Sequence, residues 1–125
     1  MSLLRACTAI SALLISSTLY ASDAAPLQAA HGVLVDAKGM TVYTYDKDES
    51  GKSNCVATCA KNWPPVVAGS ANVAAPWSVV TREDGSKQLA HDGKPLYTFV
   101  KDKKAGDKTG DGMGGAWHVV AAPAK

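Results

Sequence analysis

The chain has few features that would commit it to catalysis or to nucleic-acid binding. Its net charge is only +2, from 13 basic and 11 acidic side chains, so no strongly basic face is available for nucleic acid or anionic lipid. It contains no Ser-His-Asp order, no paired-glutamate signature and no phosphate-cradling glycine loop with its Lys and Ser. We therefore expect no enzyme, no nucleic-acid partner and no cofactor.

A long hydrophobic run is also missing. The apolar stretch 6–20 is too short and too rich in Ser and Thr to span a bilayer. It follows a single basic residue, Arg5, and precedes a small-residue region, which is the layout of a secretory signal peptide. We predict a signal peptide over residues 1–24, cleaved after Ala21 or Ala24. The mature protein would then be periplasmic or secreted, with no membrane span after cleavage.

Cysteine is scarce, and the three copies are Cys7, Cys55 and Cys59. Lipid attachment at Cys7 is not expected, because no apolar segment precedes it and Arg5 stands where a lipid-attachment motif needs a small residue. Export places Cys55 and Cys59 in an oxidising compartment, where such a pair normally closes. On one helical turn, Cα atoms four residues apart are about 6 Å apart, which a disulfide accepts. The alternative is a redox centre, or a copper site that also uses a histidine.

Internal repetition is the most informative feature that is present. At an offset of 54 residues, "GMTVYTYDKD" from Gly39 aligns with "GKPLYTFVKD" from Gly93, and Trp63 aligns with Trp117 without a gap. Chance would not keep this register over such a length, and two copies are too few for a solenoid. The sequence therefore predicts a compact domain with pseudo-twofold symmetry.

The predicted domain covers residues 31–125 and contains two repeats, at about 32–68 and 86–122. "GVLVD" and "TVYTYD" form one candidate hairpin, and "KQLAH" and "PLYTFV" form the other. "WSVVTRE" and "AWHVVAA" supply further strands, and only "CVATCAKNW" looks helical, for barely two turns. The expected fold class is all-β: a small antiparallel sheet or sandwich of two hairpin repeats with one short helical turn.

The repeated motif places aromatic residues at alternate positions. Tyr43 and Tyr45 share one face of a strand, as do Tyr97 and Phe99, because side chains alternate along a strand. We interpret these rings as core, together with the two repeated tryptophans. A platform for a glycan or a flat ligand is the functional alternative. The six aromatics concerned are Tyr43, Tyr45, Trp63, Tyr97, Phe99 and Trp117.

An acid closes each copy of the motif, Asp48 in the first and Asp102 in the second. Each lies just beyond a predicted strand end, where a carboxylate most simply accepts backbone hydrogen bonds and fixes the following loop.

This arrangement resembles a known bacterial family, the secreted repeat of unknown function. Its members are often described as lipoproteins with a Y-x-[FWY]-x-x-D motif, and the chain has that motif twice, as "YTYDKD" and "YTFVKD". The resemblance extends from about Gly32 to Val120. It implies export and a repeated architecture but no activity, and its lipid anchor is not carried over, since no suitably placed cysteine is present.

Two acidic loops are candidate metal sites. Oxygen side chains at alternate positions suit calcium, but the acid expected at the twelfth position is Ala57 in the first loop and His118 in the second. We favour solvated turns and keep a metal site as the alternative. The candidate ligands are Asp46, Asp48, Ser50, Asp107, Thr109, Asp111 and His118.

Taken together, these features predict an exported, noncatalytic module that binds or assists at the cell envelope, with a cell-envelope component as its partner. The first rival is a metal-binding or redox protein that uses Cys55 and Cys59 with a histidine, or calcium in the acidic loops. A remote third hypothesis is a hydrolase of cell-wall material, for which the carboxylates cannot be paired from sequence.

Overall fold

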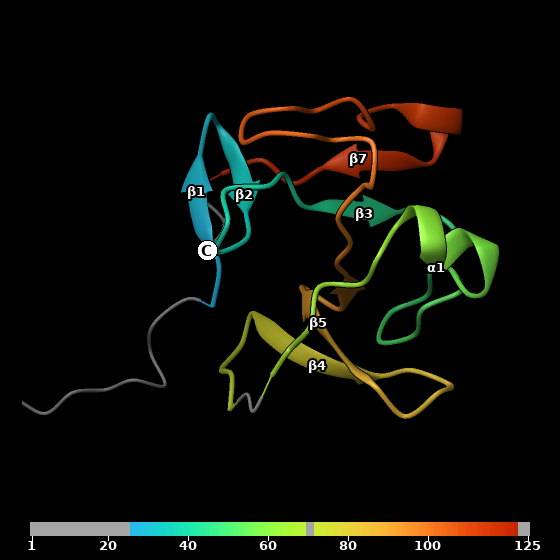
Figure 1. Ribbon diagram of the computed structural model, residues 1–125. Coiled ribbons are helices and arrows are strands. Elements are labelled where there is room, and N and C mark those ends of the chain that lie inside the picture. The colour runs from blue at the N-terminus through green and yellow to red at the C-terminus, as the bar shows by residue number, and fades with distance from the viewer. Residues whose placement is uncertain (1–25, 70–71, 123–125) are drawn as a thin grey trace, which may run out of the picture.

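The computed structural model describes residues 26–69 and 72–122. The predicted signal peptide and Cys7 lie outside these residues. Figure 1 shows the order of the elements along the chain. They are β1 (Gln28–Ala30), β2 (Val33–Val35), β3 (Tyr43–Tyr45), α1 (Thr58–Asn62), β4 (Trp77–Thr81), β5 (Lys87–His91), β6 (Lys94–Pro95), a 3-10 turn η2 (Met113–Gly115) and β7 (Trp117–Val119).

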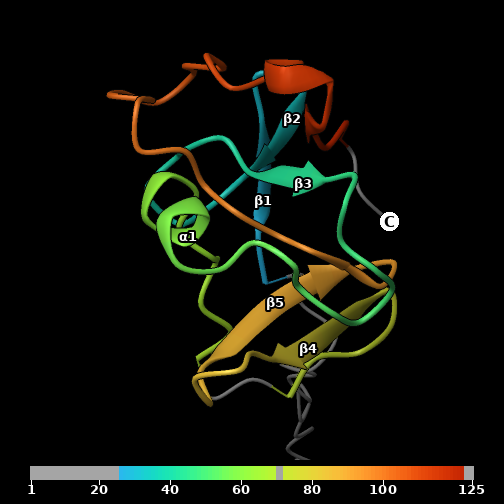
Figure 2. The ribbon, with the colours of Figure 1, turned by 90° about the vertical axis from the view of Figure 1, so that its right-hand side faces the viewer.

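The strands form three small antiparallel sheets, β1-β2, β3-β7 and β4-β5-β6. Figure 2 shows the pair β4 and β5 on the opposite side of the molecule from β2 and β3. The prediction of an all-β fold is confirmed. Within the described residues, no helix is long and apolar enough to cross a membrane.

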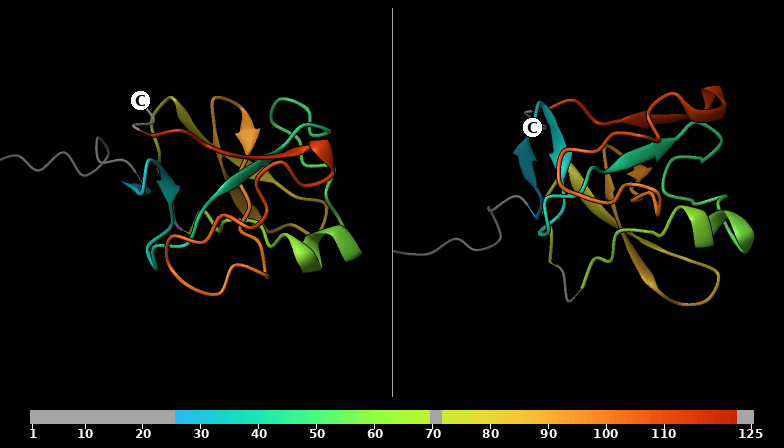
Figure 3. Two further views of the ribbon diagram at one scale, coloured as in Figure 1. Left: turned by 90° about the horizontal axis from the view of Figure 1, so that it is seen from above. Right: turned by 45° about the horizontal axis from the view of Figure 1, so that its top comes forward.

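The two motif strands meet at the centre of the domain. The backbone N–H of Tyr43 donates to the carbonyl of Tyr97 at 2.7 Å, and the N–H of Tyr97 donates to the carbonyl of Tyr43 at 2.9 Å. On its other side Tyr43 lies opposite Val119, and Tyr97 lies opposite Pro65. Val119 follows Pro65 by the same 54 residues that separate the two tyrosines. The pairing of Tyr43 with Val119 is therefore equivalent to the pairing of Tyr97 with Pro65. Each motif strand is thus flanked by the C-terminal strand of the other repeat, and the repeats interlock (Figure 3).

Alternation along the motif strands separates two clusters of buried side chains. Val42 and Leu96 belong to an aliphatic cluster that also contains Leu34, Leu89 and Trp77. Their sequence neighbours Tyr43 and Tyr97 point to the opposite face. There they belong to an aromatic cluster with Cys55, Trp63, Phe99 and Trp117. This two-faced burial follows from the period of two in an extended strand.

The first hairpin is one residue longer than the second. Val42 N donates to Leu34 O and Leu96 N donates to Leu89 O, so the offset is 54 residues after the turn and 55 before it. The first turn is wide because the Asp36 carboxylate accepts from the backbone N–H groups two and four residues further on. The second is the two-residue turn at Asp92 and Gly93, both at positive φ.

The helical segment is shorter than the sequence indicated. The helix α1 covers five residues and begins only after Ala57, whose φ of 56° is outside the helical region. Cys55 therefore lies before the helix, and the expectation that both cysteines share one helical turn is wrong. The cysteines are nevertheless bonded, with their Cα atoms 5.2 Å apart.

Candidate functional site

The two motifs exchange hydrogen bonds across the pseudo-twofold axis. The Tyr43 hydroxyl donates to Oδ2 of Asp102 at 2.7 Å, and the Tyr97 hydroxyl donates to Oδ2 of Asp48 at 2.6 Å. The tyrosine of each repeat thus pairs with the aspartate of the other. Sequence reasoning assigned each aspartate to its own loop and missed this exchange. The signal that could have revealed it was the combination of two complete motifs with an expected twofold axis.

The Asp102 carboxylate also organises the glycine-rich loop that follows it. It is 6% exposed, and its second oxygen accepts from the backbone N–H and the hydroxyl of Thr109. Gly110 N donates to the Tyr43 hydroxyl at 3.1 Å. Burial raises the pKa of Tyr43 well above its ordinary value, and the bond to Asp102 raises it further. The tyrosine therefore stays a hydrogen-bond donor at any physiological pH.

The Asp48 half of the exchange has different neighbours. Oδ1 of Asp48 accepts from Asn54 N at 2.7 Å, and the Tyr97 hydroxyl lies 2.6 Å from Oγ of Ser53. Burial raises the pKa of Asp48, against the lowering effect of the Tyr97 bond. Burial, with the bond to Asp48, raises the pKa of Tyr97 to about 12. The buried hydroxyl is thus fully used, as donor to Asp48 and as acceptor from Ser53.

Four rings stack in a row between the two repeats. Trp63 and Trp117 lie face to face with centroids 3.7 Å apart and an interplanar angle of 2°. Phe99 stacks on the outer face of Trp63 at 3.9 Å, and Tyr45 stacks on the outer face of Trp117 at 4.2 Å. Tyr43 and Tyr97 meet the tryptophans edge-on. All six repeated aromatics therefore belong to one assembly.

The two ends of this aromatic stack are not equivalent. At one end Phe99 is only 5% exposed and has Gly110 packed against it. At the other end Tyr45 is half-buried and lines a cleft of about 320 Å³. The cleft lies between the loop after β3 and the turn before β6. Its lining residues are Thr44, Tyr45, Asp46, Asp48, Glu49, Ser50, Asp92, Gly93, Lys94 and Pro95.

The cleft is strongly acidic. Four carboxylates line it and are opposed by one lysine, Lys94. Asp46 also lies 2.7 Å from Nε2 of His118 on β7. Such a surface offers hydrogen-bond acceptors and negative charge next to an aromatic ring. It suits a ligand with hydroxyl or ammonium donors and an apolar ring face.

Three of the candidate calcium ligands form hydrogen bonds that stabilise the loops. Asp107 accepts from the backbone of Lys103 and Lys104, and Asp111 accepts from Val119 N. Ser50 lines the acidic cleft, and Thr109 donates to Asp102. Within the part of the chain that the structure describes, no three His, Cys, Asp or Glu side chains are grouped so as to hold a metal ion.

The disulfide anchors the loop that separates Asp48 from the helix. Cys55 is fully buried in the aromatic cluster, and Cys59 packs against that cluster from α1. The bond closes a loop of only five residues, so the chain-entropy contribution is about 2 kcal/mol.

Replacing both Cys55 and Cys59 with alanine should therefore lower the free energy of unfolding by about 2 kcal/mol. Urea denaturation followed by circular dichroism would measure the change. The unmodified protein in excess reductant is the matched control and should lose a similar amount. An unchanged midpoint in both samples would show that the bond does not stabilise the fold.

Comparison with known proteins identifies one relationship. The family model described as "Secreted repeat of unknown function" matches residues 25–67 and again 78–121. No curated protein and no solved structure matches the chain. The two matched segments correspond to the two interlocked halves.

Proposed function

The chain belongs to the family of secreted repeats of unknown function, and from this premise we propose that it is a noncatalytic module that binds a glycan of the cell envelope. The work would take place in the periplasm or outside the cell. The observation that supports a glycan is the acidic cleft at the open end of the aromatic stack.

The cleft has the components that a sugar ring requires. Tyr45 is fixed from behind by Trp117 at 4.2 Å, so its ring is held in place before a ligand arrives. Carboxylate residues and Ser50 line the same cleft. The volume of about 320 Å³ is at the small end of ordinary ligand sites, which suits one or two sugar units of a longer chain.

The charge of the cleft favours an amino sugar. Four carboxylates against one lysine attract an ammonium group more strongly than a neutral acetamide. A partly deacetylated envelope glycan would therefore bind better than a fully acetylated one. No catalytic role is assigned to the carboxylates, since Asp48 is engaged by Tyr97 and Asn54.

The test is a nuclear magnetic resonance titration of the oxidised mature protein with glucosamine oligomers and, separately, with N-acetylglucosamine oligomers. Amides of residues 44–50 and 92–94 should shift, with the glucosamine oligomer binding more tightly. Tyr45→Ala should weaken binding about tenfold. Asp92→Asn removes one charge from the cleft and should weaken binding less than Tyr45→Ala does. The fold should tolerate this change, because Asp92 is exposed and asparagine accepts its positive φ.

Asp84→Asn is the control, since Asp84 is an exposed acid outside the cleft. If neither oligomer shifts the cleft amides, or if Asp84→Asn weakens binding as much as Asp92→Asn does, the proposal fails. Shortening of the oligomer during the titration would contradict the noncatalytic assignment.

A further inference from the structure

A second, oppositely charged cleft lies on the other side of the loop that follows the first motif. Its centre is Arg82, which directly follows β4 and is half-buried. Nη1 of Arg82 donates to Oγ of Ser53 at 2.9 Å and to Oε1 of Gln88 at 2.7 Å, and Nη2 donates to the carbonyl of Cys55 at 2.7 Å. The guanidinium is therefore held rigidly between β5 and the disulfide loop.

All three acceptors of this guanidinium are neutral. Among the described residues Arg82 forms no salt bridge. Hydrogen bonds connect it to Asp48 through two hydroxyls: Ser53 accepts from Arg82 and donates to Tyr97, which donates to Asp48. A partly buried cation without a counter-ion in contact is unfavourable, so the site is preorganised to accept an anion.

Two donor positions of Arg82 have no partner in the described part of the chain. Both hydrogens of Nη1 and one of Nη2 are taken. Nε and the second hydrogen of Nη2 have no acceptor in the described part of the chain. Nε and Nη2 share one edge of the guanidinium, and this edge can bind both oxygens of one oxyanion.

The surroundings of this fork define the size and charge of the ligand. The cleft has a volume of about 130 Å³ and is lined by Lys52, Ser53, Val56, Thr81, Arg82 and Glu83. That volume is well below the range of ordinary ligand pockets and suits one small group. Two cations and one carboxylate leave a net charge of one positive unit. This balance favours a singly charged carboxylate over a phosphate dianion.

We propose that this cleft, named here the Arg82 cleft, binds a single carboxylate group of an envelope component. Arg82 holds both oxygens through Nε and Nη2, and Lys52 adds positive charge at the rim. Glu83 limits the site to a monoanion. The Arg82 cleft is separate from the acidic cleft, because Asp48, Glu49 and Ser50 line one and Lys52 and Ser53 line the other.

Among the described residues, the corresponding network around Tyr43 contains no arginine. There the Tyr43 hydroxyl accepts from the backbone of Gly110, where the Tyr97 hydroxyl accepts from Ser53. No guanidinium takes part in that network, since Arg82 is the one arginine within the described residues. The arrangement around Arg82 therefore has no equivalent around Tyr43 in the described residues, although both matched segments line the Arg82 cleft.

The test is a nuclear magnetic resonance titration of the oxidised mature protein with sodium acetate. Sodium chloride keeps the ionic strength constant. Amides of Lys52, Val56 and Glu83 should shift saturably, with a dissociation constant on the order of 10 mM, as expected for charge-assisted hydrogen bonds to one guanidinium. Acetamide, the neutral analogue, should produce no saturable shift.

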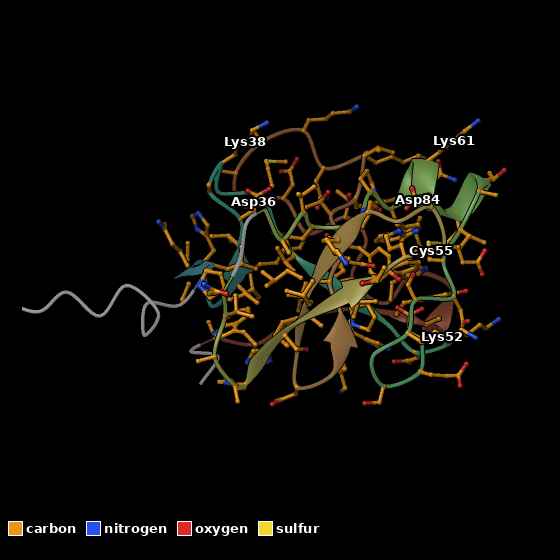
Figure 4. The ribbon with its side chains drawn as sticks, turned by 90° about the horizontal axis from the view of Figure 1, so that it is seen from below. Asp36, Lys38, Lys52, Cys55, Lys61 and Asp84 are labelled. Carbon is orange, nitrogen blue, oxygen red and sulfur yellow. A yellow bond between two sulfur atoms is a disulfide. The ribbon has the colours of Figure 1, made fainter. Side chains whose placement is uncertain are left out.

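Charge variants test the site without disturbing the network around Arg82. Lys52→Gln should weaken acetate binding by about two- to fivefold, and Glu83→Gln should tighten it by a similar factor. Lys38→Gln is the control, because Lys38 lies far from Lys52 and Cys55 (Figure 4) and should leave binding unchanged.

Absence of a saturable shift at acetate concentrations up to about 0.1 M, where screening is already strong, would overturn the proposal. Equal effects of Lys52→Gln and Lys38→Gln would do the same. Inorganic phosphate that binds about tenfold more tightly than acetate would overturn the assignment to a carboxylate. The readouts do not involve the acidic cleft, so the glycan proposal can fail while this one holds.

Discussion

Replacing Asp102 with alanine should lower the free energy of unfolding by about 3 kcal/mol, because it removes the acceptor of a buried hydrogen-bond group. Tyr43 would keep its hydroxyl in the interior without an acceptor, and the N–H of Thr109 would lose its partner. The variant should also loosen the glycine-rich loop, because this carboxylate holds Thr109 within it. Chemical denaturation measures the first effect, and amide hydrogen exchange over residues 103–112 measures the second.

A double-mutant cycle with Tyr43→Phe isolates the exchange between repeats. If the two groups act as one unit, the loss in the double variant should be smaller than the sum of the single losses by about 1 kcal/mol or more. Asp46→Ala is the control, since the Asp46 side chain is 58% exposed and should cost little stability. Additive losses for Asp102→Ala and Tyr43→Phe would refute the cross-repeat coupling.

The repeat architecture was readable from the sequence because it depends on local and periodic signals. Matching aromatics at alternate positions predicted that Tyr43 and Tyr97 would share a face with the tryptophans and that Val42 and Leu96 would take the other, as the two clusters show. Glycine after Asp92 marked the tight turn. These features require only the period of a strand and the conformational freedom of glycine.

The pairing between repeats could not be read in the same way. An acid after a strand is equally consistent with a local cap and with a distant partner, and only the interlocked topology brings Asp102 to Tyr43. The start of the helix was predicted wrongly for a related reason, because the disulfide and the positive φ of Ala57 override a weak helical preference. Arg82 carried no motif at all, and its importance appears only when three neutral acceptors surround it.

The contrast between the halves locates the candidate binding sites. Both repeats keep the tyrosine, the aromatic and the aspartate, so these residues serve the common frame. The two clefts occur where the halves have diverged, beside Tyr45 at the open end of the stack and beside Arg82. Each cleft joins residues of both matched segments, so a difference in one copy of a loop is enough to make the cleft occur once rather than twice.

Gly110 is the position at which the frame should be least tolerant of change. A Cβ added there would lie 2.5 Å and 2.8 Å from two ring carbons of Trp63 and 3.0 Å from Phe99. The rings cannot retreat, because Trp63 is stacked on Trp117 at 3.7 Å. Gly110→Ala should therefore push the loop outward, break the bond from Gly110 to Tyr43, and cost about 3 kcal/mol. Denaturation by urea measures the loss.

The companion variant Trp63→Phe tests this cause directly. Phenylalanine lacks the outer ring carbons that Gly110 approaches, so Gly110→Ala should cost much less in the Trp63→Phe background than in the unmodified protein. Trp63→Phe alone will be destabilising, since it puts a smaller ring in the stack. The quantity to compare is therefore the cost of Gly110→Ala in each of the two backgrounds. Equal costs in both backgrounds would show that the loop yields without disturbing the rings. Gly110 would then not be required to fit against Trp63, and only the burial of Phe99 would close that end of the aromatic stack.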